Sequence, residues 1–363
     1  MKERIVLAYA GGLQASVAIP WLAEAYDAEV VTLTLDLGQG RDLEEIRDRA
    51  LATGAVRAHV LDVREEFARH FVLPALQAGA LHEGRDPMAA ALARPLIART
   101  LLEIASIERA TAIAHGCTGM DQQRMDTCAR ALNPDMRVIA AAGPGASSQG
   151  THANLWGRAY TSTKPQIPNP NSQLPNPKSE SPKPKAQSPR PAETPDTPAS
   201  IEIAFERGVP AAINGVPMAL TELIESLSII AGQHGVGRIA AEERVEESDE
   251  AGAQLCRVYE APAAVVLHAA HTALETSILS RELRRLKRDR AAEYAHLVWN
   301  GLWFTPMREA MDALNAKVQE HVSGSVRITL FKGTLLSSEA AELDAEPDTD
   351  FDADRNDAAV PSR

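Results

Sequence analysis

The sequence has few aromatic residues, few cysteines and no long apolar run. Phe, Trp and Tyr make up 4% of its 363 residues, so the core must consist mostly of Ala, Val, Leu and Ile. No apolar run reaches the roughly 18 residues that a membrane-spanning helix requires. The first residues lack the apolar stretch and cleavage site of a secretory signal. We therefore predict no membrane partner. Cys117, Cys128 and Cys256 are odd in number and show no metal-ligand spacing, which predicts a reduced, cytoplasmic compartment.

The chain also lacks an excess of basic residues. Its formal charge of −12 argues against a protein that coats nucleic acid, so we predict no nucleic-acid partner. Nine acidic residues against Arg355 and Arg363 give residues 337–363 a charge of −7, which predicts an acidic disordered tail over 337–363. The rest of the chain carries only −5, so the net charge says little about the folded part.

Proline is concentrated in one segment. Eleven of the 23 prolines lie in residues 164–198, among Lys, Gln, Asn and Ser and with few apolar side chains. Proline removes backbone donors, and such a segment cannot bury a core, so we predict a disordered linker over 164–198. The linker separates a first domain, 1–163, from a second domain, 199–336.

Apolar strands alternate with helices in the first domain. The predicted strands lie at 5–9, 29–36, 56–62 and 110–114. The predicted helices lie at 16–25, 42–53 and 88–108. This alternation predicts an α/β, Rossmann-like domain with a parallel sheet, its first helix capped by Ser16. In the second domain, an α+β fold is predicted from strands at 201–206 and 326–331 and helices at 219–233 and 262–290.

Two glycine-containing turns follow strands of the predicted sheet. The first, at 10–16, is not of the Walker type, but its glycines and free helix-start amides favour a phosphate. A tight turn without a ligand is the alternative. The second turn, at 115–119, follows a later strand. Because ligands bind beyond the carboxyl ends of parallel strands, the two turns are expected to line one crevice.

Polar residues of the second turn have structural alternatives to a role in binding. Asp121 and Arg124 suit a charged substrate, or they form a surface ion pair at helical spacing. His115 bonds either the backbone or a phosphate. Cys117 is interpreted as a small buried residue, because nothing nearby in the sequence marks it as an activated nucleophile.

Two other groups of residues fall on the predicted helices of the second domain. His268 and His271 are interpreted as packing or surface residues, and no metal ligand is predicted. The basic run at 284–290 is a solvated face or a subunit contact.

Long segments on both sides of the linker resemble argininosuccinate synthase. They include VLAYAGGLQAS at 6–16, ALARPLIA at 91–98, AHGCTG at 114–119, GQHGVGRI at 232–239 and LVWNGLWFTPMREAMDA at 297–313. The resemblance covers roughly 1–139, 154–158 and 201–336. It implies a nucleotide-binding domain of the N-type ATP pyrophosphatase kind, followed by a synthetase and multimerisation domain, in a homo-oligomer that is usually a tetramer.

The resemblance implies a carbon–nitrogen ligase of arginine biosynthesis that uses ATP with Mg²⁺. The family adenylates citrulline, releases pyrophosphate and lets the aspartate amine displace AMP. The implied ATP-binding residues are Ala8, Ala10, Gly11, Gly12, Ser16, Leu35 and Gly116. Those implied for aspartate are Thr118 and Asp121, and those for citrulline are Arg124, Glu242 (or its neighbour Glu243) and Tyr259. No catalytic residue is assigned.

The sequence departs from the family pattern where polar ligands are expected. Ala10, Gln14 and Ala15 replace the Ser, Asp and Thr of the family loop Ser-Gly-Gly-Leu-Asp-Thr-Ser. Asp86 stands in place of a tyrosine, and alanines at 89–91 replace a Gly-Thr-Ser run that faces citrulline. The family's Thr-Gly-Lys-Gly-Asn-Asp-Gln is shortened, without its asparagine, at 118–122.

These losses predict that the family reaction is impaired. Each lost hydrogen bond to a charged group costs about 1.5–3 kcal/mol, so four losses slow the reaction by several orders of magnitude. Three alternatives stay open. They are an active ligase with another amino-acid substrate, a non-catalytic paralogue that keeps the fold for binding or regulation, and a decaying copy.

Overall fold

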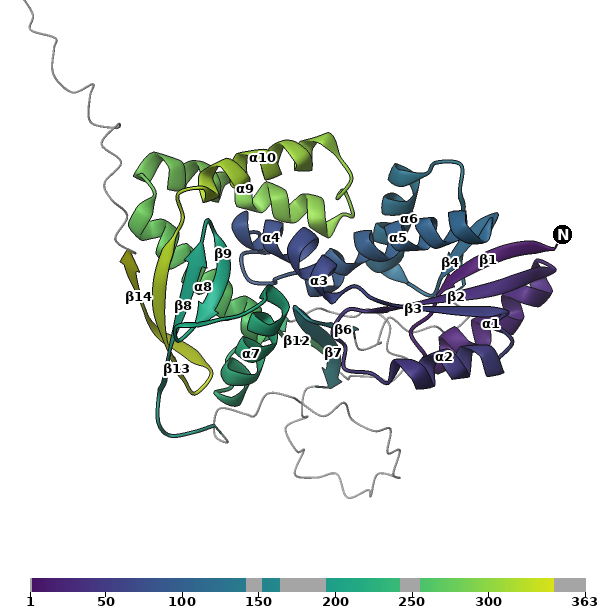
Figure 1. Ribbon diagram of the computed structural model, residues 1–363, viewed down its shortest axis with the longest axis horizontal. Coiled ribbons are helices and arrows are strands. Elements are labelled where there is room, and N and C mark those ends of the chain that lie inside the picture. Colours follow the sequence, from purple (N-terminus) through teal and green to yellow (C-terminus); the bar gives the residue numbers. More distant parts are fainter. Residues whose placement is uncertain (1, 142–151, 164–193, 242–254, 343–363) are drawn as a thin grey trace, which may run out of the picture.

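The computed structural model describes residues 2–141, 152–163, 194–241 and 255–342 (Figure 1). Most of the expected linker and tail therefore lies outside the described residues. At the end of the expected linker, Thr194 is buried and Asp196 pairs with Lys332 at 2.5 Å. The tail prediction is wrong for residues 337–342, because they belong to strand β14 (Thr334–Glu342), which pairs with β13 (Gly324–Phe331).

The first part of the chain forms a five-stranded parallel sheet in the order β3-β2-β1-β4-β5. Its strands are β1 (Glu3–Ala8), β2 (Ala28–Asp36), β3 (Arg57–Asp62), β4 (Ala112–His115) and β5 (Arg137–Ala140). The central strands are apolar runs because helices cover both faces of the sheet. The first four strands were predicted within one or two residues of their ends.

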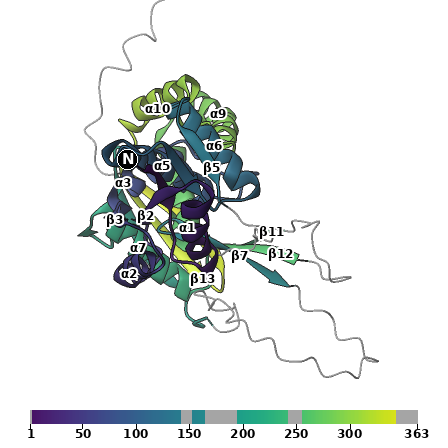
Figure 2. The same ribbon diagram turned by 90° about the vertical axis from the view of Figure 1, so that its right-hand side faces the viewer.

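Helices cover the sheet on both faces, as Figure 2 shows. Below the strands lie α1 (Leu13–Ala25) and α2 (Leu43–Ala52), whose Leu22 and Ile46 share a buried cluster with Ile5 of β1. Above the strands lie α5 (Ala89–Glu108) and α6 (Gly119–Leu132), which pack in a second core with Val6 and Ile113. This doubly wound arrangement confirms the predicted α/β class.

One broken helix leads from the sheet toward the later part of the chain. It runs through α3 (Arg64–Phe67), a π-helical turn (Ala68–Val72) and α4 (Leu73–Gln77). Phe71 lies in the π-helical turn and stacks on Trp303 with a centroid separation of 5.0 Å. The two parts of the chain therefore share one apolar core at this point.

An antiparallel sheet in the order β10-β9-β8-β13-β14 supports the later helices. Its other strands are β8 (Ala199–Glu206), β9 (Val209–Ile213) and β10 (Val216–Pro217). The helices are α7 (Leu220–Gln233), α8 (Pro262–Ile278), α9 (Arg281–Trp299) and α10 (Pro306–Gln319). The single helix expected at 262–290 is two helices, because Ser280 caps α9 by accepting a hydrogen bond from the Leu283 amide at 3.3 Å.

A third sheet joins segments that are far apart in the sequence. It contains β6 (His152–Asn154), β7 (Gly157–Thr163), β11 (Arg238–Ala241) and β12 (Leu255–Glu260), in the order β11-β12-β7-β6. We placed residues 152–163 in the first domain, yet β7 hydrogen-bonds with β12 of the later half. The change of sheet therefore falls between β5 and β6 rather than at residue 163. Among the described residues, no helix is long and apolar enough to cross a membrane.

Candidate functional site

The first glycine turn follows β1 and is held by its backbone. Gly11 has φ +75°, and a Cβ atom there would lie 2.7 Å from Cγ1 of Ile46. Two side chains of the α2 region fix the turn from outside, since Arg41 donates to the Ala10 carbonyl at 2.5 Å and Arg49 to the Gly11 carbonyl at 2.7 Å. The turn conformation thus depends on glycine at position 11.

This dependence gives a test of the turn. Gly11→Ala should lower the free energy of unfolding by about 2–4 kcal/mol, because it combines a positive φ with a clash against Ile46. Gly12→Ala is the matched control: Gly12 has φ −76° and open space around it, so a loss below about 1 kcal/mol is expected. Urea denaturation of both variants measures the difference, and equal losses would contradict the prediction.

The start of α1 presents backbone amides rather than polar side chains. Gly12 is the N-cap residue, and no side chain caps the first turn. Ser16 is not the cap that we predicted. Its hydroxyl lies 2.7 Å from the Tyr9 hydroxyl and donates to the Gly12 carbonyl at 3.2 Å. The amides can donate hydrogen bonds to a phosphate, which the helix dipole also favours, while Ala15 adds no polar atom.

The second turn follows β4, which is the parallel neighbour of β1. The carboxyl ends of β2, β1 and β4 therefore bring together the residues predicted for ATP at one edge of the sheet. Leu35 is near the end of β2, Ala8 ends β1, and Gly116 directly follows β4. The two turns follow adjacent parallel strands at one edge of the sheet, as predicted, whereas the crevice and its ligand stay predictions.

His115 makes structural contacts within the second turn. It is fully buried, its Nδ1 accepts a hydrogen bond from the Cys117 amide at 3.3 Å, and its Nε2 lies 3.1 Å from Asp126. Of our two interpretations, backbone bonding is the one observed. Burial opposes the protonation of His115, but Cys117 and Asp126 together raise its pKa above the ordinary value.

Cys117 has one charged neighbour, Arg94, that the sequence does not reveal, in addition to His115 of its own turn. It is only partly buried, and burial by itself would disfavour the thiolate. Nevertheless, Arg94 and His115 lower the pKa of the Cys117 thiol below its usual value. We found no activating residue near Cys117 because Arg94 comes from α5, more than twenty positions earlier in the chain.

Asp121 and Arg124 form a buried pair rather than the surface pair that was one of our two interpretations. Their relative exposures are 8% and 4%. The Asp121 carboxylate accepts from Arg124 Nη1 at 2.7 Å and from Arg94 Nη2 at 2.8 Å. Arg124 also donates to the Trp299 carbonyl at 2.6 Å and stacks on the Trp299 ring at 4.2 Å. The sequence prediction misses Arg94 and Trp299. The buried Arg94 is identified by its ion pair with Asp121, and the partly buried Trp299 by its contacts with Arg124.

The remaining predicted residues lie in or near other elements. Thr118 is the N-cap residue of α6, without a side-chain cap hydrogen bond. Tyr259 lies on β12, between Ile239 and Ala159 of the flanking strands. Glu242 lies outside the described residues.

The third sheet reaches the loop after β2. There the Leu155 amide donates to the Leu37 carbonyl at 2.6 Å. The sheet that carries Tyr259 therefore contacts the segment that directly follows β2 at the edge of the first sheet.

The histidines and the basic run of the later helices can also be placed. His268 lies 5.9 Å from the Trp156 ring, and His271 lies 2.8 Å from Gln319 Oε1, so both are buried packing residues as predicted. Within the basic run of α9, Lys287 is not solvated. It is buried, pairs with Glu275 and donates to the Gln77 carbonyl at 2.6 Å.

Comparison with known proteins identifies the family. Residues 4–154 match the argininosuccinate synthase N-terminal HUP domain, and residues 151–343 match the argininosuccinate synthase C-terminal domain. The chain belongs to the argininosuccinate synthase family. Its junction between the two family domains, near residues 151–154, coincides with the change of sheet at β6.

Full-length relatives support the same assignment. An argininosuccinate synthase of Symbiobacterium thermophilum is 44% identical over 92% of this chain and 86% of its own length. One of Oceanobacillus iheyensis is 40% identical over 92% of this chain and 82% of its own. A solved NAD⁺ synthetase from Burkholderia pseudomallei is 18% identical over 39% of this chain and 55% of its own, with a TM-score of 0.27, a likeness too distant to inform the site.

Proposed function

We propose that this chain keeps the argininosuccinate synthase scaffold but performs the family reaction in an impaired form. That reaction is the ATP-dependent ligation of citrulline and aspartate, with release of AMP and pyrophosphate, in arginine biosynthesis. One observation carries the proposal: the turn after β1 keeps its glycine backbone, while Ala10 and Ala15 offer no polar side chain where the family pattern has a serine and a threonine.

The residues present fit the phosphates of ATP better than they fit its metal ion. The uncapped start of α1 can accept a phosphate through backbone amides. Gln14 replaces the carboxylate of the family loop, and the described residues contain no group of three or more His, Cys, Asp or Glu that could hold a metal ion. Mg²⁺ prefers oxygen ligands that include carboxylates, so its support in this loop is reduced.

The residues predicted for the amino acids also have contacts within the protein. Asp121, proposed for aspartate, pairs with both Arg94 and Arg124, and Arg124 is the residue proposed for citrulline. A substrate must share these groups with their present partners. The contacts of Asp121 and Arg124 therefore support weakened binding of aspartate and citrulline. Thr118 stays proposed for aspartate, and Glu242 and Tyr259 for citrulline.

The alternative is a non-catalytic paralogue that binds nucleotide without ligation. The observation that favours it is the intact first turn, which Arg41 and Arg49 hold by its carbonyl groups. Both an impaired ligase and a nucleotide-binding paralogue should bind ATP, whereas a chain that has lost the site should not. Calorimetry with ATP and Mg²⁺ measures this binding. Absence of binding at millimolar ATP would exclude every nucleotide-dependent role.

The deciding assay measures AMP and pyrophosphate that depend on both citrulline and aspartate. The Symbiobacterium relative, which is 44% identical, serves as the positive control. Loss of a few charge-assisted hydrogen bonds predicts a rate lower by about 10³-fold or more. A rate similar to that of the relative would overturn the proposal.

Restoring the loop should restore part of the nucleotide affinity. Ala10→Ser with Gln14→Asp returns one hydroxyl and one carboxylate, and we expect ATP to bind at least about tenfold more tightly with Mg²⁺ present. Ala10→Ser with Gln14→Asn is the matched control, since it shortens the side chain without adding charge. Calorimetry compares the variants, and equal affinities would show that the carboxylate is not what the loop lacks.

We further propose a homo-oligomer, a tetramer by the family resemblance. Leu286 of α9 is 41% exposed beside the exposed Arg285 and so is available to a subunit contact. Light scattering of the full chain measures the mass, and a monomer of 39.0 kDa at all concentrations would contradict this proposal.

A further inference from the structure

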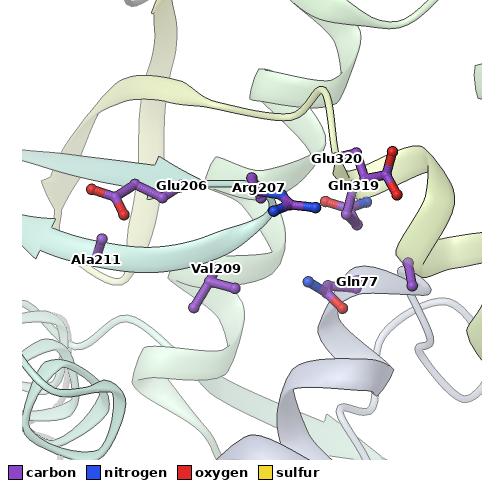
Figure 3. A pocket seen from close by; sticks show the side chains of 8 residues that line it. Gln77, Glu206, Arg207, Val209, Ala211, Gln319 and Glu320 are labelled. Atoms are coloured by element: carbon purple, nitrogen blue, oxygen red, sulfur yellow. The ribbon is translucent and has the colours of Figure 1, made fainter.

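A pocket of about 480 Å³ lies in the later half of the chain (Figure 3). Its walls are the end of α4 at Gln77, the β8–β9 hairpin and the end of α10. None of its lining residues belongs to the candidate site described above. The pocket is open to solvent and combines one cation, two carboxylates, two amides and an aliphatic wall.

Arg207 supplies the cation of this pocket. It lies in the two-residue turn between β8 and β9, where its backbone amide donates to the Ser323 hydroxyl at 2.9 Å. Its guanidinium forms no ion pair or hydrogen bond with the described residues. In Figure 3 it points toward Gln319, with the Gln77 amide across the opening and Glu206 directed to the other side.

Gln319 forms a rigid floor. It is 1% exposed, its Oε1 lies 2.8 Å from His271 Nε2, and its Nε2 donates to Glu275 at 2.6 Å. A Cβ atom on Gly208 of the turn would overlap Gln319, so the hairpin sits directly against this amide. The Gln319 amide is therefore fixed before any ligand arrives, whereas the exposed Arg207 side chain must be ordered by the ligand, at an entropic cost.

The chemistry of the pocket favours a single carboxylate. The planar fork of Arg207 and the nearby Gln77 amide match the two oxygens of a carboxylate. Val209, Ala211 and Ala316 form an aliphatic wall beside them. Glu206 and Glu320 also line the pocket, and their repulsion opposes any anion, a dianion about twice as strongly as a monoanion.

We propose that this pocket binds a small aliphatic monocarboxylate, with its carboxylate on Arg207 and its apolar body against Val209. The site is independent of the proposed ligation. It is tested by binding alone, with the full chain and 4-methylpentanoate as the probe, followed by NMR or calorimetry. 3-Methylbutylamine, which has the same body but an amine, and inorganic phosphate are the comparison ligands.

Binding of the carboxylate is expected with a dissociation constant in the millimolar range, about that of a small fragment. Arg207→Gln should weaken it by at least about tenfold. Arg285→Gln is the matched control, since Arg285 is also exposed and lies on α9, outside the pocket lining. Equal binding to wild type and Arg207→Gln would overturn the proposal. Phosphate or amine binding as tight as that of the carboxylate would overturn the ligand class.

A second variant covers the case in which Arg207→Gln does not fold. Ala316→Glu places a negative charge on the exposed wall at α10 without touching the turn. It should abolish carboxylate binding, while the size-matched Ala316→Gln retains most of it. Unchanged binding in Ala316→Glu would show that the ligand sits elsewhere.

Discussion

Asp121→Asn is expected to lower the free energy of unfolding by about 3–5 kcal/mol. The carboxylate lies between Arg94 at 2.8 Å and Arg124 at 2.7 Å, and the side chains of all three are about nine-tenths buried. Asparagine has nearly the same size but no charge. It leaves two guanidinium groups close together in a low-dielectric interior without this counter-ion, which is far costlier than the loss of an exposed pair.

Two controls separate this effect from a general loss of charge. Asp48→Asn removes an exposed partner of Arg47, and a change below about 0.5 kcal/mol is expected. Arg94→Gln combined with Asp121→Asn should cost less than the sum of the single changes, because the double variant leaves one buried guanidinium, that of Arg124, without the Asp121 carboxylate instead of two. Urea denaturation followed by circular dichroism gives each value. A loss below about 1 kcal/mol in Asp121→Asn would contradict the buried network.

The same network shows where prediction from sequence ends. The turns at Gly11 and Gly116 could be placed because strand periodicity and glycine are local signals. Their position at the same edge of the sheet followed from the parallel arrangement of β1 and β4. Arg94 and Trp299 could not be placed, because burial beside Asp121 results from packing between α5, α6 and the end of α9. Whether a charged residue is exposed depends on such distant contacts and not on its spacing along one helix.

Errors in the fold have a similar origin. Residues 152–163 carry no sign of their partner strand, which comes about a hundred residues later in β12. Composition alone suggested disorder for 337–342, but the Lys332-Gly333 turn has positive φ at both residues and folds them back onto β13. The apolar pattern predicted one helix over 262–290, but Ser280 caps a new helix, α9, within that range. In each case a nonlocal pairing or one capping hydrogen bond outweighed the local pattern.

Acidification is expected to destabilise the protein through His268. This residue is buried on α8 against Trp156, and burial, with a smaller contribution from His271, lowers its pKa to about 3. In the unfolded chain the pKa is about 6.5, so between these values the unfolded state binds a proton that the folded state does not. Stability due to this residue is therefore complete above about pH 6.5 and falls as the pH decreases, by about 3 kcal/mol at pH 4.5.

His268→Gln tests this contribution, because glutamine keeps a polar side chain that does not titrate. The variant should lose less stability than the wild type between pH 7 and about pH 4.5, whatever its stability at pH 8, where histidine is neutral in both states. Glu275, Lys287 and His271 also face this region, and they are unchanged in the variant, so their titration cancels in the comparison. Denaturant unfolding at several pH values measures the slopes. Parallel slopes would show that another group, and not His268, causes the acid sensitivity.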